Sequence, residues 1–438
     1  MDGFRQARAE IDRIDAELAQ LFTARMAAVA EIAAYKQANG LPIRDPAREA
    51  EVLARNTARI ADAALRAHYA AFQTALMACS RRYQAELIPT GGTKPLLTVH
   101  TAKGAYPVYL RRGLLQKGGT LLDLNRRVFL VTDEGVPPAY TQTLAVQCRQ
   151  VVCHRVAQGE ASKSPAVLEA LLSAMLKAGL TRSDCVLAVG GGVVGDLAGL
   201  AAALYQRGID WYNCPTTTLS MVDASIGGKT AINLCGVKNA VGAFAPPRAV
   251  LIDPDVLDTL PQRQLVNGLA EAVKMGLTHD AALFARFENP AGYGAIEDVI
   301  AACLRIKQAV VEADEQERGL RRVLNFGHTL GHGIEAAADG ALLHGECVGL
   351  GMLPMCAPNV RARLKPVLER LGLPTYVNFK TIDPERVLAA AAHDKKAQAG
   401  GEIEAVYVPE VGSYQIRRIG ADALRAMLQS LSGNEGTL

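Results

Sequence analysis

Hydrophobic residues recur every three or four positions across residues 4–37, and neither Gly nor Pro interrupts that segment. This spacing is typical of one long amphipathic helix. Asp45 followed by Pro46 is typical of a helix N-cap and first turn, so a second helix is predicted over 46–58. A third helix is predicted over 61–86. The first helix is longer than a compact bundle needs, which suggests helices exchanged with a partner chain.

From about residue 96 the pattern changes to short β-rich runs separated by helical stretches. Strands alternating with helices are typical of a parallel α/β sheet. The strands are expected at 96–100, 128–132, 150–156 and 185–189, and helices at 165–179 and 195–206. After about residue 255 the strand pattern fades, and helical spacing dominates to residue 375 and again over 421–431.

These patterns divide the chain into parts of different fold class. We predict a multi-domain protein with an all-α domain over 1–88, a polar linker over 89–95, an α/β domain over 96–254 and a helical domain over 255–438. The length of 438 residues agrees with several domains, because one hydrophobic core seldom supports so long a chain.

Composition and charge narrow the class of protein. Hydrophobic residues make up 50% of the chain and charged residues 21%, as in ordinary soluble globular proteins. The net charge of +3 favours neither nucleic acid nor an anionic membrane as a partner. The nine cysteines form no CxxC pair, as expected for reduced thiols. Without a signal-type or membrane-spanning segment, a cytoplasmic location is expected.

Polar residues in the predicted N-terminal helices suggest a site for an anion. Arg8, Arg25 and Lys36 fall within one broad face of the first helix, because residues three or four apart share a face. Composition alone also allows a second interpretation, in which these are solvated charges on an alanine-rich bundle.

The order of these polar residues over 4–86 resembles the active site of the all-helical chorismate mutases. The resembling residues are Arg8, Arg25, Lys36, Asp45, Arg48, Glu49, Ser80 and Gln84. The resemblance implies that Arg25, Arg48 and a partner chain's Arg8 bind the two carboxylates of chorismate. It also implies that Lys36 and Gln84 donate to the ether oxygen and that Glu49 holds the ring hydroxyl. Members of that family are domain-swapped dimers. A regulatory or dimerisation module without catalysis is the alternative.

A glycine-rich turn follows the strand predicted at 185–189. Gly191 and Gly192 would let the backbone approach a pyrophosphate at the N-terminus of the next helix. A strict GxGxxG pattern is absent, so a tight structural turn is the alternative. The glycine loop of residues 227–230 lacks the spacing of a P-loop, because Asp223 stands where the first glycine should be. A nucleoside triphosphatase is therefore rejected.

Histidines gather in one part of the predicted helical domain. His328 and His332 lie one helical turn apart, and His344 follows beyond a turn that contains glycine. Together with Glu271 from an earlier helix, they offer two histidines and one carboxylate, a set that leaves a zinc position open for substrate. The alternative for the helical pair is packing in the core.

A series of motifs over residues 96–425 closely resembles 3-dehydroquinate synthase. In order, they are GGGVVGDLAG, PTTTLSMVDASIGGKTAIN, GLAEAVK, LNFGHTLGHGIE and LHGE. The resemblance implies that Glu271, His328 and His344 bind Zn²⁺, or Co²⁺ in its place, and that His332 relays protons. The implied substrate residues are Arg207, Asp223, Lys229, Lys238, Asn239, Lys274, Lys307, Arg321, Asn325 and one lysine of Lys395-Lys396, taken as Lys396. The implied NAD-binding residues are Asp133, Glu160, Lys163, Gly191, Gly192, Asp196, Thr216 and Thr217.

The resemblance implies conversion of 3-deoxy-D-arabino-heptulosonate 7-phosphate into 3-dehydroquinate and phosphate. NAD would oxidise an alcohol, phosphate would leave by β-elimination, and the same NADH would reduce the ketone again. Two alternatives are other sugar phosphate cyclases, whose substrates lack a carboxylate, and polyol dehydrogenases of the glycerol dehydrogenase type. Arg321 and Asn325 fit an acid-binding pocket and favour the synthase. A homodimer or larger homo-oligomer is expected.

Overall fold

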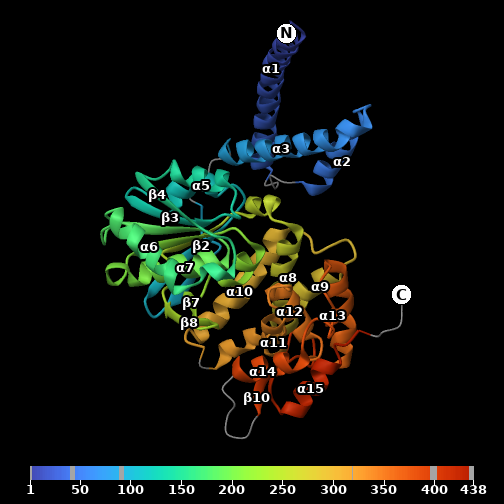
Figure 1. Cartoon of the computed structure of the whole chain (residues 1–438). Coiled ribbons are helices and arrows are strands. Elements are labelled where there is room, and N and C mark those ends of the chain that lie inside the picture. The colour runs from blue at the N-terminus through green and yellow to red at the C-terminus, as the bar shows by residue number, and fades with distance from the viewer. Residues whose placement is uncertain (1, 40–44, 88–92, 318, 395–401, 434–438) are drawn as a thin grey trace. The chain divides into compact units, whose positions relative to one another are not determined.

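The computed structural model has two compact units, Met1–Thr93 and Lys94–Leu438 (Figure 1). The residues that the structure describes are 2–39, 45–87, 93–317, 319–394 and 402–433. The predicted boundary between residues 88 and 89 and most of the predicted linker 89–95 lie outside them. None of the described helices is long and apolar enough to cross a membrane.

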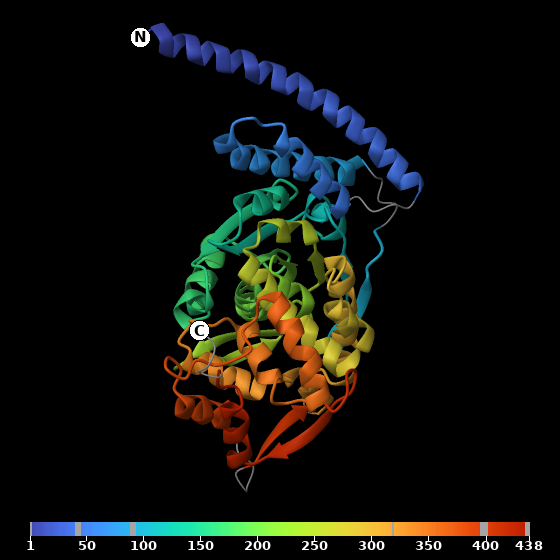
Figure 2. The same cartoon turned by 90° about the vertical axis from the view of Figure 1, so that its right-hand side faces the viewer.

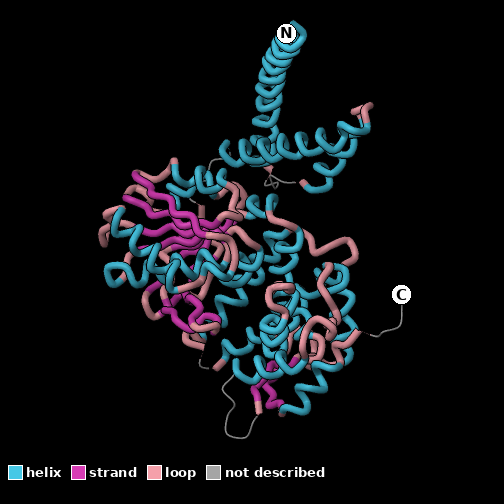
Figure 3. The backbone as a smooth tube through the Cα atoms, in the orientation of Figure 1, coloured by secondary structure: helices cyan, strands magenta, loops and turns pink. Residues whose placement is uncertain are grey.

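The first unit consists of helices, as predicted (Figure 3). They are α1 (Asp2–Ala38), α2 (Pro46–Ala58) and α3 (Ala63–Leu87). The predicted N-cap of α2 is confirmed, because the Asp45 side chain accepts a hydrogen bond from the backbone N–H of Arg48 at 3.0 Å. Helix α3 packs against both α1 and α2.

The N-terminal part of α1 extends past α2 and α3 (Figure 2). Val29 and Ala33, in its C-terminal half, are buried. Phe4, Ile11 and Leu21, on the extending part, are 63%, 56% and 66% exposed. A row of large apolar side chains in contact with water is unfavourable, and such a row usually marks a surface that another chain covers.

The second unit begins with the predicted α/β architecture. Its seven-stranded sheet has the order β1-β2-β9-β6-β5-β3-β4 and is parallel except for the β1–β2 pair. The strands are β1 (Leu97–Thr101), β2 (Gly104–Leu110), β3 (Arg127–Asp133), β4 (Gln150–Val156), β5 (Cys185–Gly190), β6 (Asp210–Pro215) and β9 (Ala249–Ile252). The short helices around them are α4 (Gly118–Leu121), α5 (Pro138–Ala145), α6 (Pro165–Lys177) and α7 (Gly192–Leu204). All residues of β5 are buried, as parallel strands covered on both faces require.

Several elements of this part were not predicted. Strands β2, β6 and β9 belong to the sheet, and β7 (Lys229–Leu234) and β8 (Val237–Phe244) form a separate antiparallel hairpin. Helix α7 begins at Gly192, earlier than the predicted start at 195, so the glycine-rich turn itself enters the helix.

Helices dominate after residue 255, also as predicted. They are α8 (Gln262–His279), α9 (Ala281–Glu288), α10 (Ile296–Ala313), α11 (His328–Ala337), α12 (His344–Met352), α13 (Pro358–Leu371), α14 (Pro384–Asp394) and α15 (Ala421–Gln429). An unpredicted hairpin, β10 (Ile403–Tyr407) with β11 (Gln415–Ile419), precedes the last of them. One hydrophobic core runs from the sheet into these helices. The predicted boundary between residues 254 and 255 lies inside this unit, where sheet gives way to helices, and as a domain boundary it stays a prediction.

Close packing of α11 against α12 depends on a residue without a side chain. A Cβ atom at Gly351 in α12 would overlap the carbonyl oxygen of Gly327, just before α11. Since backbone atoms have little room to move, Gly351→Ala should destabilise the unit by about 1–3 kcal/mol. Gly349→Ala in the same helix is the control, because its Cβ would lie 3.6 Å from the Leu368 side chain. Thermal unfolding followed by circular dichroism should show a lower midpoint for the first variant only.

Candidate active site

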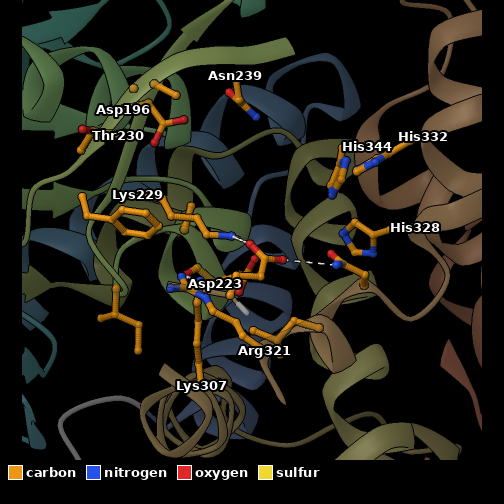
Figure 4. Close-up of a pocket in the computed structure, with 18 of the residues that line it drawn as sticks. Asp196, Asp223, Lys229, Thr230, Asn239, Lys307, Arg321, His328, His332 and His344 are labelled. Carbon is orange, nitrogen blue, oxygen red and sulfur yellow. Dashed lines mark hydrogen bonds and ion pairs between the residues drawn. The ribbon is translucent and has the colours of Figure 1, made fainter. Parts of the chain in front are cut away.

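A cavity of about 560 Å³ lies between the β7–β8 hairpin and the helices α8, α10, α11 and α12 (Figure 4). Its volume suits a small-molecule ligand. Many of the predicted residues line it: Asp196, Asp223, Lys229, Asn239, Lys274, Lys307, Arg321, Asn325, His328, His332 and His344. Residues that are far apart in the sequence thus meet at one place.

A carboxylate and two imidazoles meet beside this cavity. Glu271 of α8 is fully buried, and its Oε1 lies 3.7 Å from Nε2 of His328 and 3.4 Å from Nε2 of His344. Ligand atoms of these three residues lie within 4.8 Å of one another. His328 and His344 are the first residues of α11 and α12, so the starts of two helices bring them together.

Hydrogen bonds fix which nitrogen of each histidine faces Glu271. Nδ1 of His328 lies 3.1 Å from the backbone carbonyl oxygen of Phe326. Nδ1 of His344 lies 3.2 Å from a carboxylate oxygen of Glu335. When both Nδ1 atoms donate their protons to these oxygens, both Nε2 lone pairs remain for a cation.

The charges around Glu271 suit a bound divalent cation. Burial by itself would raise the pKa of Glu271, but Lys274 and then His328 hold that pKa well below its ordinary value. Burial, together with Lys274, lowers the pKa of His328 well below its ordinary value. An ionised carboxylate and a neutral imidazole are the forms that bind zinc. Burial would lower the pKa of His344, but the carboxylates of Glu271 and Glu335 raise that pKa to about 9, so a metal ion would take the place of a proton there. With that proton displaced, the three residues fit a metal ion with an open coordination position.

Further cationic and acidic side chains line the cavity. Lys307 pairs with the Asp223 carboxylate at 2.7 Å, and Lys274, which is 1% exposed, pairs with Glu271. Lys229 pairs with Glu317, which also accepts a hydrogen bond from Asn325 at 3.3 Å (dashed in Figure 4). A cluster of this kind can bind a ligand with several negative charges.

The predicted nucleotide residues lie at one edge of the sheet. Asp133 ends β3, Gly191 follows β5, and Thr216 follows β6, so the carboxyl ends of parallel strands bring them together. A Cβ atom at Gly191 would lie only 3.0 Å from the Thr217 side chain, so any residue larger than glycine would crowd this turn. The turn leads directly into α7, whose N-terminus can face a pyrophosphate. These residues fit a dinucleotide.

Hydrogen bonds join this edge of the sheet to the β7–β8 hairpin. Lys163 binds Asp196 at 2.7 Å and also contacts the side chain of Asn239 in β8. Glu160 accepts a hydrogen bond from Asn233 at 2.9 Å.

Two of the predicted substrate residues that the structure describes, Arg207 and Lys238, do not line the cavity. Arg207 is exposed after α7. Lys238 is half exposed and pairs with Glu335 at 2.7 Å. Lys396 lies outside the described residues.

The first unit also brings several of its predicted residues together. Arg25 of α1 contacts the Ser80 hydroxyl of α3, and Gln84 is buried one turn further on. Burial lowers the pKa of Lys36, an effect that nearby Asp45 and Glu49 partly offset. These helices thus form one polar cluster.

Two predicted mutase residues lie apart from this cluster. Arg8 is exposed and stacks on the Phe4 ring, 4.3 Å from its centroid. Arg48 is exposed and pairs with Glu51 at 2.6 Å.

Sequence reasoning missed Glu317, Glu335 and Arg81. Arg81 is buried and binds Glu49 at 2.8 Å. A lone charged residue in a sequence looks like surface, so no pattern singled out these three.

A buried carboxylate–histidine set beside a nucleotide-type sheet edge defines a metal- and nucleotide-dependent enzyme. Family models described as the N-terminal and C-terminal parts of 3-dehydroquinate synthase match residues 153–267 and 268–397. The 3-dehydroquinate synthase of Rhodospirillum rubrum is 44% identical over 334 residues, which cover 70% of this chain and 86% of that protein. The 3-dehydroquinate synthase of Latilactobacillus sakei is 39% identical over 351 residues, which cover 76% of this chain and 98% of that protein. The chain belongs to the 3-dehydroquinate synthase family, and a chorismate mutase type II model matches its residues 7–85.

Solved structures share the architecture of the second unit. 2-epi-5-epi-valiolone synthase from Streptomyces hygroscopicus, with NAD⁺ and Zn²⁺ bound, is 30% identical with a TM-score of 0.67, covering 74% of this chain and 96% of that one. 2-deoxy-scyllo-inosose synthase, complexed with carbaglucose-6-phosphate, NAD⁺ and Co²⁺, is 24% identical with a TM-score of 0.69. The match covers 76% of this chain and 99% of that one. The second likeness concerns the fold alone.

Anion binding in the cavity should weaken as the pH rises above about 8. Burial lowers the pKa of Lys307 to about 8, and Asp223 offsets this only in part. The Lys307 amine is therefore protonated and charged below that pH and neutral above it. Loss of this charge removes one charged contact and should weaken anion binding about tenfold. Calorimetric titration with inorganic phosphate at pH 7.5 and 9.5 measures the change. Lys307→Arg, which stays charged, should reduce the loss; an equal loss in that variant would contradict the assignment to Lys307.

Proposed function

We propose that this chain is a bifunctional enzyme of the shikimate pathway. Its second unit converts 3-deoxy-D-arabino-heptulosonate 7-phosphate into 3-dehydroquinate and phosphate, and its first unit converts chorismate into prephenate. The observation that carries the first activity is the Glu271–His328–His344 set facing a cluster of lysines and Arg321 across one cavity. A cytoplasmic location fits the cysteines, which are all free thiols.

Glu271, His328 and His344 would hold the divalent metal, Zn²⁺ or Co²⁺. When bound, the metal polarises substrate hydroxyl groups, and NAD takes up and returns a hydride. The chain's part is to bind and orient. Lys274 and Lys307 are buried cations beside the cavity, so they can neutralise the phosphate as it leaves.

Acid–base catalysis requires a group that lines the cavity and can exchange a proton with the substrate. The His332 ring lies 5.0 Å from that of His328 and 5.8 Å from that of His344, between centroids, and it lines the cavity. We assign a ring nitrogen of His332 the role of accepting and returning a proton, because the ring lines the cavity beside the proposed metal ligands. Glu317 holds Lys229 and Asn325 in place.

For NAD, the proposed binding residues are those at the carboxyl edge of the sheet. The helix N-terminus at Gly192 would face the pyrophosphate. Asp196 and Lys163 form an ion pair beside it. Asp133, Glu160, Thr216 and Thr217 complete the proposed set.

Other sugar phosphate cyclases and polyol dehydrogenases share this fold but fit less well. Arg321 is 2% exposed and lines the cavity, where its fork can bind a substrate carboxylate that those cyclases do not meet. A polyol carries no anion, so a dehydrogenase would have no substrate charge for Arg321 and Lys307 to bind in this cavity.

The mutase activity is proposed to need a second copy of the chain. Arg25, Lys36 and Gln84 lie in one cluster, whereas Arg8 lies on the part of α1 that carries the exposed apolar row of Phe4, Ile11 and Leu21. A homodimer would cover that row and would bring Arg8 to the partner's cluster. Arg48 would then turn from Glu51 to a substrate carboxylate.

Metal removal should separate the two activities. Treatment with a chelator should abolish dehydroquinate formation, and added Zn²⁺ should restore it. Prephenate formation should not change, because the metal-type clusters among the described residues all lie in the second unit. Both rates are measured on the same protein sample, and metal-independent dehydroquinate formation would contradict the proposed centre.

Arg25→Ala should lower prephenate formation by about 10²-fold or more, because a half-buried guanidinium that would bind a substrate carboxylate is lost. Dehydroquinate formation in the same sample is the control and should not change. If the wild-type chain forms no prephenate, the first unit is a regulatory or dimerisation module, and the synthase proposal still stands.

A further inference from the structure

Glu335 is a partly buried acidic residue to which the proposed reaction gives no role. It lies on α11 with His328 and His332, and the spacing of four and then three residues puts all three on one helix face. Its side chain is 17% exposed. The carboxylate therefore stands next to the proposed metal ligands instead of pointing into water.

One oxygen of Glu335 controls the orientation of His344. Oε2 lies 3.2 Å from Nδ1 of His344, whose Nε2 faces Glu271. The other proposed histidine ligand, His328, is oriented by a backbone carbonyl oxygen. Of the two groups that contact the Nδ1 atoms of these histidines, only Glu335 is a side chain. An ionised carboxylate at this place fixes the tautomer of the imidazole and makes its free nitrogen a stronger ligand.

The other oxygen of Glu335 binds a cation from a distant strand. Oε1 pairs at 2.7 Å with Nζ of Lys238, which lies on the β7–β8 hairpin. The Lys238 side chain is 51% exposed, so this pair by itself contributes little to stability. Its importance lies in the shared carboxylate, because the charge of Lys238 partly neutralises the group that orients His344.

We propose that Glu335 is a positioning residue that orients His344 as a metal ligand and links the affinity for the metal to the position of Lys238. This inference rests on the proposed function, in which His344 holds the metal. An anion that draws Lys238 away leaves Glu335 with its full charge, and the metal is then held more tightly. Linkage requires the converse too, so a bound metal favours release of Lys238 toward the anion.

The test measures metal affinity, not turnover. Metal-free wild-type and variant proteins are titrated with Zn²⁺ in competition with a chromophoric chelator. Glu335→Gln keeps the size of the side chain but removes its charge, and it should weaken Zn²⁺ binding by about 10–100-fold. Asp339→Asn is the matched control, since Asp339 follows the same helix but pairs with Arg386 at 2.9 Å, and it should bind Zn²⁺ as the wild type does.

A cycle of variants tests the link to Lys238. Lys238→Met should tighten Zn²⁺ binding several-fold in the wild-type background and should change nothing in the Glu335→Gln background. The absorption bands of the Co²⁺-loaded protein should shift in Glu335→Gln, whereas a purely structural role would leave them in place. If Glu335→Gln does not fold by circular dichroism, Glu335→Asp replaces it, with the charge kept at shorter reach and an intermediate affinity expected.

The outcomes separate this inference from the proposed function. Wild-type affinity in Glu335→Gln or Glu335→Asp overturns the positioning role. Equal effects of Lys238→Met in both backgrounds overturn the link. A wild-type protein that binds no Zn²⁺ overturns the proposed metal centre itself.

Discussion

The ionised carboxylate of Glu271, buried with no exposed surface, is the constraint on which the second unit depends. An unpaired charge at such depth costs several kcal/mol, so its neighbours must compensate for it. Lys274 on the same helix does so, together with His344 at the start of α12, whose pKa is raised to about 9 although burial would lower it. His328 at the start of α11 lies beside the same carboxylate. These helices must therefore approach α8 closely. Gly345 permits this approach, since a Cβ atom there would overlap the backbone of Asn267 in α8.

Around this centre, each structural layer supplies a different chemical group. The sheet offers the carboxyl ends of β3, β5 and β6, where backbone and small residues suit a dinucleotide. The helices offer side chains with charge, because a helix can direct successive turns toward one cavity. The β7–β8 hairpin connects the two sets, since Lys229, Lys238 and Asn239 all come from it and contact residues of the other elements.

The two units achieve their stability in different ways. The second has a continuous hydrophobic core of its own, which extends from Val99 in the sheet to Leu431 after the last helix. The first buries few apolar residues of α1 and leaves a row of large ones exposed. Its long helix satisfies backbone hydrogen bonds without burying that row. Two activities in such a chain can be independent, because neither proposed site uses residues of the other unit.

Sequence alone determined the helices of the first unit, several strands of the sheet and the Glu271–His328–His344 set, since these depend on local periodicity and on short, distinctive motifs. Only the tertiary structure revealed β2, β6 and β9, which become strands of the sheet through pairing with their neighbours. It alone revealed the roles of Glu317, Glu335 and Arg81, because each acts through a partner far away in the sequence. A charged side chain carries no local sign of whether it faces water or a buried partner, and the packing of distant segments decides which.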